Sequence, residues 1–208
     1  MDNKKFDFEK VQEATKMLLE AFGEDINRPG LKDTPRRVAG YWQELLEGQE
    51  YTNKEIADMF KKDFQVSDDP LVVVDMEDIY SHCEHHLALM FNGVAYIAYI
   101  PAYYNGHNAD DGYRVIGLSK IYRIVDMCSK RLQLQEKLAS DIVECIELAT
   151  GSDKVYVNLS MNHGCVSARG IKSRGKTNVT KMSTALKQDL EARKEIENKV
   201  LQMKLDKK

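Results

Sequence analysis

The sequence predicts an α+β protein with an antiparallel sheet, because its hydrophobic pattern changes period several times along the chain. A helical third comes first, strand-like segments begin near Leu71, and helices, further strands and a last helix follow. Strands grouped together, rather than alternating regularly with helices, favour an antiparallel sheet. With 208 residues the chain is long enough for one well-packed core. We expect a helical N-terminal extension over residues 1–65 and one functional domain over residues 66–208.

Helices are expected at both ends of the chain and in its middle. Apolar residues recur at helical spacing over residues 8–22, and a second helix should begin at Thr34, with proline at its first position. Apolar faces at helical spacing recur over residues 121–128 and 138–149. A charged helix is expected from about residue 186 to residue 203.

Strands are expected between these helices. The run LVVVD at residues 71–75 is short and apolar, and two apolar segments flank Asn92-Gly93, a dipeptide typical of hairpin turns. The polar, turn-rich stretch AYYNGHNADDG at residues 102–112 is expected to be a loop. Further strands are expected in KVYVNLSMNHGC and TNVTKMST.

Composition limits the classes of partner. The formal net charge is −3, so no basic or acidic excess indicates binding to nucleic acid or to a membrane surface. No stretch approaches eighteen consecutive apolar residues, and the start MDNKKFDFEKVQ lacks the apolar region of an export signal. A cytoplasmic location is therefore expected. Of the four cysteines, Cys128 and Cys145 lie on apolar helical faces and are expected in the core.

The segment SHCEHH, residues 81–86, packs three histidines around a cysteine. Zinc prefers such ligands, and a catalytic zinc has three protein ligands. Cys83 and His86 can share one ion only if the chain turns or bulges between them, because residues three apart on a strand face opposite sides. A third ligand is expected from HGC, where His163 and Cys165 would lie on one side of a strand. The alternative is a buried Cys83 and histidines without metal.

A second class of function is suggested by GIKSRGKT at residues 170–177, which fits the phosphate-binding P-loop pattern. A P-loop needs a helix that starts at its Lys-Thr pair. The following TNVTKMST has strand character instead, which disfavours a P-loop hydrolase. Another basic group, Ser119, Lys120 and Arg123 near a helix start, could bind an anion or be an ordinary solvated surface.

Taken in order, SHCEHH, AYIP, VIGLSKIYRIV, QLQEKL and NHGCVSARG resemble the GTP cyclohydrolase I family. The similarity runs from about RPGLKDTPRRVA to Gly170. It implies the tunnelling fold (T-fold), a small antiparallel sheet with helices packed on one side and an N-terminal helical extension. It also implies a cytoplasmic zinc enzyme that assembles as a homodecamer with its pockets at subunit interfaces.

The resemblance implies the opening of the guanine imidazole ring of GTP, with release of formate and formation of 7,8-dihydroneopterin triphosphate. This is the first step of folate and pterin biosynthesis. Carried over by position, the Zn2+ ligands would be Cys83, His86 and Cys165, and the acid-base residues would be His85 and His163. The substrate-binding positions would be Gln135 and Glu136 for guanine and Ser119, Lys120, Arg123 and Arg169 for the triphosphate.

Three departures from the family pattern stand out. The segment Ala102 to Arg114 is longer than in most relatives, and Leu132 stands where relatives usually have proline. The tail after Gly170 diverges most, so no site residue is assigned there. We expect no chemical role for His82 or His107. Besides the P-loop hydrolase, a catalytically inactive zinc-bearing oligomer that binds a pterin or a purine remains an alternative.

Overall fold

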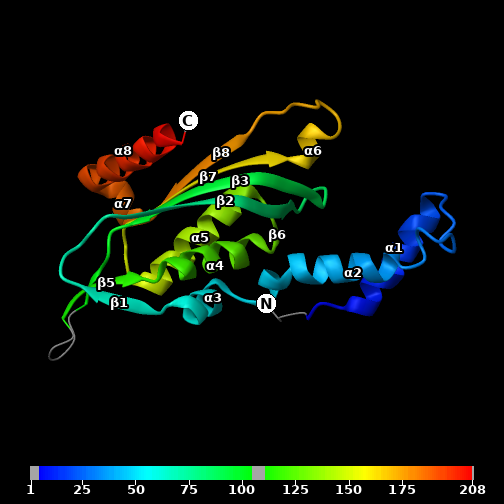
Figure 1. The fold of residues 1–208 in the computed structure, drawn as a ribbon, viewed down its shortest axis with the longest axis horizontal. Coiled ribbons are helices and arrows are strands. Elements are labelled where there is room, and N and C mark those ends of the chain that lie inside the picture. Colours follow the sequence, from blue (N-terminus) through cyan, green and yellow to red (C-terminus); the bar gives the residue numbers. More distant parts are fainter. Residues whose placement is uncertain (1–4, 105–110, 208) are drawn as a thin grey trace.

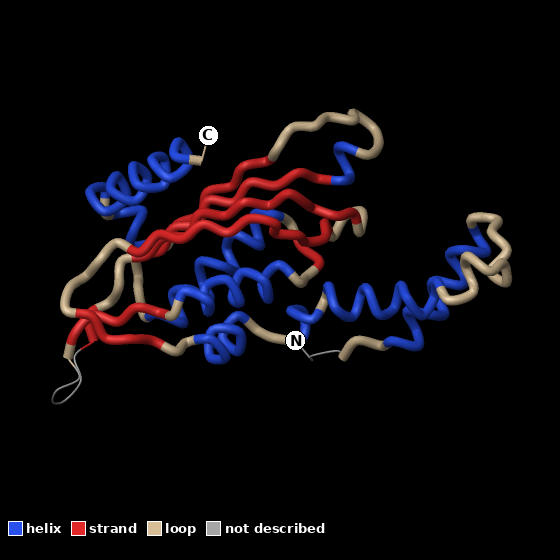
Figure 2. Tube along the Cα trace, viewed as in Figure 1, coloured by secondary structure: helices blue, strands red, loops and turns tan. Residues whose placement is uncertain are grey.

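The computed structural model describes residues 5–104 and 111–207. A twisted five-stranded sheet forms its centre, with helices on both faces (Figures 1 and 2). All neighbouring strands are antiparallel except the short β6, which is parallel to β2. The α+β class and the mainly antiparallel sheet are thus confirmed. The strand order is β6 (Leu132–Gln133), β2 (Val72–Cys83), β3 (Ala88–Tyr99), β7 (Val155–His163) and β8 (Thr177–Met182).

The main core lies between this sheet and the helices on one face. These are α3 (Asn53–Phe60), α4 (Leu118–Ser129) and α5 (Gln135–Thr150). Their apolar stripes pack with inward-facing strand residues into one buried cluster, which includes Cys128 and Cys145 at 0% exposure, as expected. Helix α5 ends at Gly151, whose φ of 70° is the left-handed conformation that suits glycine at a helix end.

The opposite face of the sheet is covered by the C-terminal helices α7 (Thr184–Gln188) and α8 (Leu190–Asp206), as Figure 1 shows. A second buried cluster forms here, in which Tyr96 and Tyr156 of the sheet meet Leu186, Ile196 and Val200 of the helices. The expectation of helices on one side therefore holds for α3 to α5, and α7 and α8 add a layer that the sequence pattern did not assign to a face.

The prediction of a hairpin turn at Asn92-Gly93 is wrong. Strand β3 runs through both residues, and the turn of the β2–β3 hairpin lies between Cys83 and Ala88. Asn92 has a φ of 50°, and the register with β7 shifts between Phe91 and Val94, so the dipeptide forms a bulge. A Cβ on Gly93 would lie 2.5 Å from the carbonyl oxygen of Ile79, so only glycine fits there.

The N-terminal helices α1 (Phe8–Ala21) and α2 (Thr34–Leu45) form a pair that projects from the body of the molecule (Figure 1). Helix α2 contacts the sheet at His82, whose ring lies 3.1 Å from the Tyr41 hydroxyl and edge-on to Trp42. His82 is thus a packing residue, and burial lowers its pKa. The division of the chain at residue 65 stays a prediction, and β1 (Asp63–Val66) crosses it.

A buried ion pair ties the segment between α2 and α3 to the core. The guanidinium of Arg131 donates to the Asp141 carboxylate at 2.7 Å, and also to the backbone carbonyls of Gly48, in the 3-10 helix Glu47–Glu50, and of Tyr51. Both charged side chains are at most 10% exposed. Because a buried charge is stable only when it is paired and hydrogen-bonded, this cluster holds the extension firmly against α4 and α5.

A second, three-stranded sheet lies beside the main body. Strand β5 (Gly112–Ile116) pairs with β1 on one side and with β4 (Tyr103–Tyr104) on the other. The segment expected to be a loop therefore includes strand residues at both of its described ends. The tip, with His107, lies outside the described residues. Among the described helices, none is long and apolar enough to cross a membrane.

Candidate metal centre

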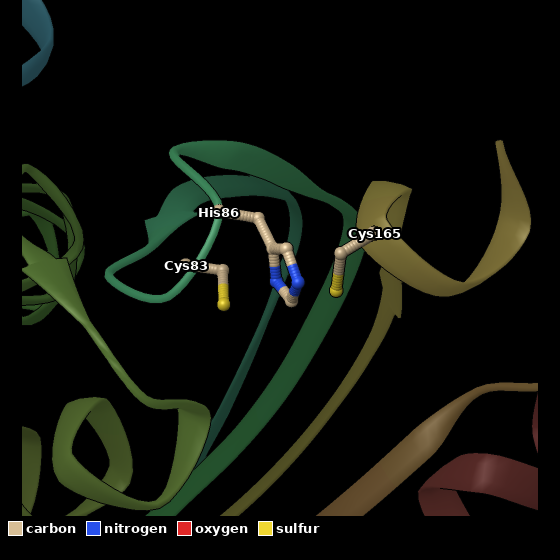
Figure 3. Close-up of side chains that lie close together, drawn as sticks. All are labelled: Cys83, His86 and Cys165. Atoms are coloured by element: carbon tan, nitrogen blue, oxygen red, sulfur yellow. The ribbon is translucent and has the colours of Figure 1, made fainter. Parts of the chain in front are cut away.

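Three side chains predicted as metal ligands lie together at one end of the main sheet. Strand β2 ends at Cys83, and the chain then turns, with Leu87 at a φ of 52°, so that His86 returns toward Cys83. The sulfur atoms of Cys83 and Cys165 and a ring nitrogen of His86 all lie within 4.8 Å of one another. Figure 3 shows these side chains converging on one point. The turn that the sequence demanded between Cys83 and His86 is present.

Cys165 reaches this cluster from a short helix rather than from a strand. Strand β7 ends at His163, and Cys165 belongs to α6 (Gly164–Ser167). The expectation that His163 and Cys165 share one side of a strand is therefore wrong. Gly164 allows the change of direction, because a Cβ there would lie only 3.0 Å from the carbonyl oxygen of Leu89. Helix α6 consequently packs closely on β3 and turns Cys165 toward Cys83.

The donor set fits zinc. Two sulfurs and one imidazole nitrogen are soft and borderline ligands, and three protein ligands are typical of a catalytic zinc. Zinc–sulfur bonds of about 2.3 Å place two sulfurs of a tetrahedral site roughly 3.8 Å apart. The spacing of at most 4.8 Å between the donor atoms needs only a small contraction to reach that geometry.

The surroundings of Cys165 favour its protonated thiol in the metal-free protein. Burial raises the pKa of Cys165, and the neighbouring Cys83 thiol raises that pKa further. Zinc binds the thiolate, so metal binding here must release protons, and affinity must increase with pH.

Beside the cluster, His163 is held in one orientation by a buried glutamine. The carboxamide nitrogen of Gln135 donates to the carbonyls of Leu159, at 2.9 Å, and Thr177, at 3.1 Å. This fixes the Gln135 oxygen toward Nε2 of His163, 2.8 Å away. Because an amide oxygen only accepts, Nε2 carries the hydrogen and Nδ1 is the basic nitrogen of the neutral ring.

The sequence did not predict this positioning contact, since Gln135 was expected to touch the substrate. Its side chain is 1% exposed, and its predicted contact with guanine stays a prediction. Burial lowers the pKa of His163, while the negative charge of Glu136 raises it. Glu136 itself is exposed in the first turn of α5, next in sequence to Gln135.

Two more predicted residues flank the cluster. His85 is exposed, with its ring centroid 6.4 Å from that of His86. The guanidinium of Arg169 lies 3.4 Å from Nε2 of His86. The structure therefore groups His85, Arg169 and the His163–Gln135 pair around the three candidate ligands.

The remaining predicted substrate-binding residues belong to α4, with Ser119 and Lys120 in its first turn and Arg123 near its middle. Ile116, two residues before this helix, donates from its backbone N–H to the hydroxyl of Tyr99. Tyr99 pairs with Val72 at the far end of β2 from Cys83. Helix α4 has 12 residues and therefore a length of about 18 Å.

Comparison with known proteins identifies the family of this chain. The family model described as GTP cyclohydrolase I matches residues 11–201. The chain belongs to the GTP cyclohydrolase I family. Among curated relatives, GTP cyclohydrolase 1 of Clostridium acetobutylicum is 43% identical over 179 residues, which cover 84% of this chain and 87% of that protein. GTP cyclohydrolase 1 of Clostridium beijerinckii is 41% identical over 183 residues, covering 85% and 88%.

A search of solved structures finds one of an archaeosine synthase QueF-Like protein in the apo form. Its TM-score is 0.39 and its identity 22%, and the match covers 56% of this chain and 96% of that one.

The match of the GTP cyclohydrolase I family spans both halves of the cluster, from the turn after β2 to α6. The resemblance seen in the sequence motifs is thereby confirmed, and with it the assignment of this chain to an enzyme family.

Proposed function

We propose that this chain hydrolyses GTP at C8 of guanine, releases formate and forms 7,8-dihydroneopterin triphosphate. The observation that carries the proposal is the convergence of Cys83, His86 and Cys165 beside an oriented His163, in a member of the GTP cyclohydrolase I family. Cys83, His86 and Cys165 would hold zinc. When bound there, zinc would supply Lewis-acid activation of water near neutral pH.

His163 is proposed as the principal acid-base residue. Its neutral ring presents Nδ1 as a base, because Gln135 occupies Nε2. Burial lowers the pKa of His163, so the neutral form predominates at pH 7 and the protonated form gives up its proton readily. These properties suit a group that takes a proton and returns it to N7 as the imidazole ring opens. His85, exposed beside His86, is the second candidate for proton transfer.

Recognition of guanine is assigned to Glu136, with Gln135 beside it. An exposed carboxylate can accept hydrogen bonds from both N1–H and the 2-amino group of guanine. Adenine has neither of these two donors. Arg169, next to His86, is proposed to bind phosphate oxygens.

Assembly into a homo-oligomer is part of the proposal, with the family's decamer as the expected form. Helix α4 begins near the end of β2 opposite Cys83, with Ser119 and Lys120 in its first turn and Arg123 near its middle. In the proposed assembly, each site combines the metal centre of one subunit with these residues of another. A cytoplasmic location also belongs to the proposal, because Cys83 and Cys165 must stay reduced to bind zinc as thiolates.

The decisive experiment incubates purified protein with GTP and measures formate, oxidised neopterin and inorganic phosphate, with and without a chelator. Formate and neopterin without free phosphate, lost on chelation, are expected. Phosphate without formate would favour the P-loop alternative, although Lys176 and Thr177 lead into β8 and not into a helix. Nucleotide binding without either product would favour the inactive zinc-bearing oligomer.

A further inference from the structure

The loop between α6 and β8 has a concentrated positive charge. Residues 169–176, here called the cationic loop, read RGIKSRGK and contain four cations and no acid. The surrounding segment, residues 164–188, also lacks aspartate and glutamate. This loop contains the P-loop-like motif, which the proposed chemistry does not use.

Both ends of the cationic loop are attached to the candidate site. At its start, Arg169 contacts the candidate ligand His86 at 3.4 Å. Just after its end, the carbonyl of Thr177 accepts from Gln135, the same side chain that orients His163. Both ends of this short segment therefore lie next to residues of the candidate site.

The middle of the loop is held by hydrogen bonds from Asn162 of β7 and by one hydrogen bond within the loop. The side chain of Asn162, only 8% exposed, donates to the carbonyls of Arg174 and Gly175, at 3.3 Å each. The hydroxyl of Ser173 accepts from the backbone N–H of Gly175 at 3.2 Å. The backbone polar groups are thus turned toward the protein, while the side chains of residues 171–176 are exposed.

The three cations that follow Arg169 have no acidic partner. Over residues 5–104 and 111–207, Lys172, Arg174 and Lys176 take part in no ion pair with a carboxylate. Uncompensated cations next to a site attract anions and accelerate their approach. Arginine in addition offers a planar fork of donors that matches phosphate oxygens.

We propose that Lys172 and Arg174 bind the outer phosphates of the nucleotide triphosphate and make the site selective for triphosphates over guanosine. The inference rests on the proposed function and extends it to residues that the family motifs do not include. The exposed cations of the cationic loop bind substrate and do not take part in ring opening. Removing them should therefore change KM and leave kcat in place.

The test compares the double variant Lys172→Gln/Arg174→Gln with a control that loses the same charge, Lys194→Gln/Lys199→Gln. The control lysines are exposed on α8 and lie outside the cationic loop. We expect the loop variant to raise the KM for GTP about 5- to 30-fold, as for two exposed charge contacts, with kcat within about twofold. The control should stay within about twofold of the unmodified chain in both constants.

Calorimetric titration with inorganic tripolyphosphate separates this inference from the proposed function. Affinity lost in the loop variant and kept in the control supports the inference, even in protein that releases no formate from GTP. Formate release with the same KM in all three proteins, together with unchanged tripolyphosphate affinity, would overturn the inference and leave the proposed function standing.

Discussion

Replacing Gln135 by methionine should separate the orientation of His163 from the presence of His163. Methionine is similar in volume and keeps the core filled, but it removes the hydrogen bonds to His163, Leu159 and Thr177. At about 0.5–1.5 kcal/mol for each bond, the loss is roughly 1.5–4.5 kcal/mol of the free energy of unfolding. A chain of this length should then lose roughly 3–18 °C in Tm, at about 2–4 °C per kcal/mol.

The fall in kcat should be larger than the loss of stability alone would cause. Without Gln135 the His163 ring can rotate and change its tautomer, and a misplaced catalytic group costs on the order of 100-fold in rate. We expect kcat to fall by about that factor, with the bound zinc nearly unchanged. A contact of Gln135 with guanine would in addition raise the KM for GTP.

Gln133→Met provides the matched control. Gln133 is also buried, at 0% exposure, and donates to the Ser81 hydroxyl and the Cys128 carbonyl, but it does not contact His163. Its two hydrogen bonds predict a loss of about 1–3 kcal/mol in stability. Its kcat should stay within a factor of about three, since no catalytic group loses its support. If both variants lose turnover equally, or if Gln135→Met retains full kcat, Gln135 does not position His163.

Three further predictions concern the site and the C-terminal helix. His163→Ala should leave the zinc content near normal by elemental analysis while abolishing neopterin formation, and normal turnover would remove His163 from its role. In metal-free protein treated with a mild oxidant, peptide mapping should find a Cys83–Cys165 disulfide, and its absence would count against a shared site. Asp189 caps α8 and pairs with Lys154 at 2.7 Å, which holds its pKa below the usual 3.8. Its stabilising effect is therefore present above that pH and lost as pH falls through the lower folded value. Asp189→Ala should reduce the urea midpoint at pH 7, and the difference from the unmodified chain should shrink progressively as pH falls below 3.8.

Local chemistry made the metal centre predictable from sequence. Cys83, His86 and Cys165 are rare residue types in two clusters, and one ion needs them at one point, so their spacing carried the information. The same reasoning misplaced Cys165 on a strand, because Gly164 changes the chain direction through a contact with β3 that has no signature in the sequence. The position of Gln135 likewise depends on the separation of β7 and β8, which only the fold determines.

The unusual backbone conformation at Asn92-Gly93 was predictable from sequence, but the bulge that it forms was not. Asn92 adopts the positive φ for which Asn-Gly is suited, yet the result is a bulge, because Gly93 must pass close to the backbone of Ile79. The hairpin turns instead at residues 84–87, where the ligand motif itself supplies the bend. Apolar periodicity predicted α4 and α5 well, but periodicity alone could not tell which face of the sheet each helix covers. The charged helix expected from about residue 186 to residue 203 is divided at Asp189 into α7 and α8.

The distance between the metal centre and the start of α4 has a genetic consequence. Under the proposed assembly, every complete site combines parts of two chains. A chain defective at Cys83 and a chain defective at Arg123 would each be inactive alone, yet their mixture would regain some complete sites. Conversely, a chain defective at both Cys83 and Arg123 would damage two sites, because each chain contributes a different part to each of two sites.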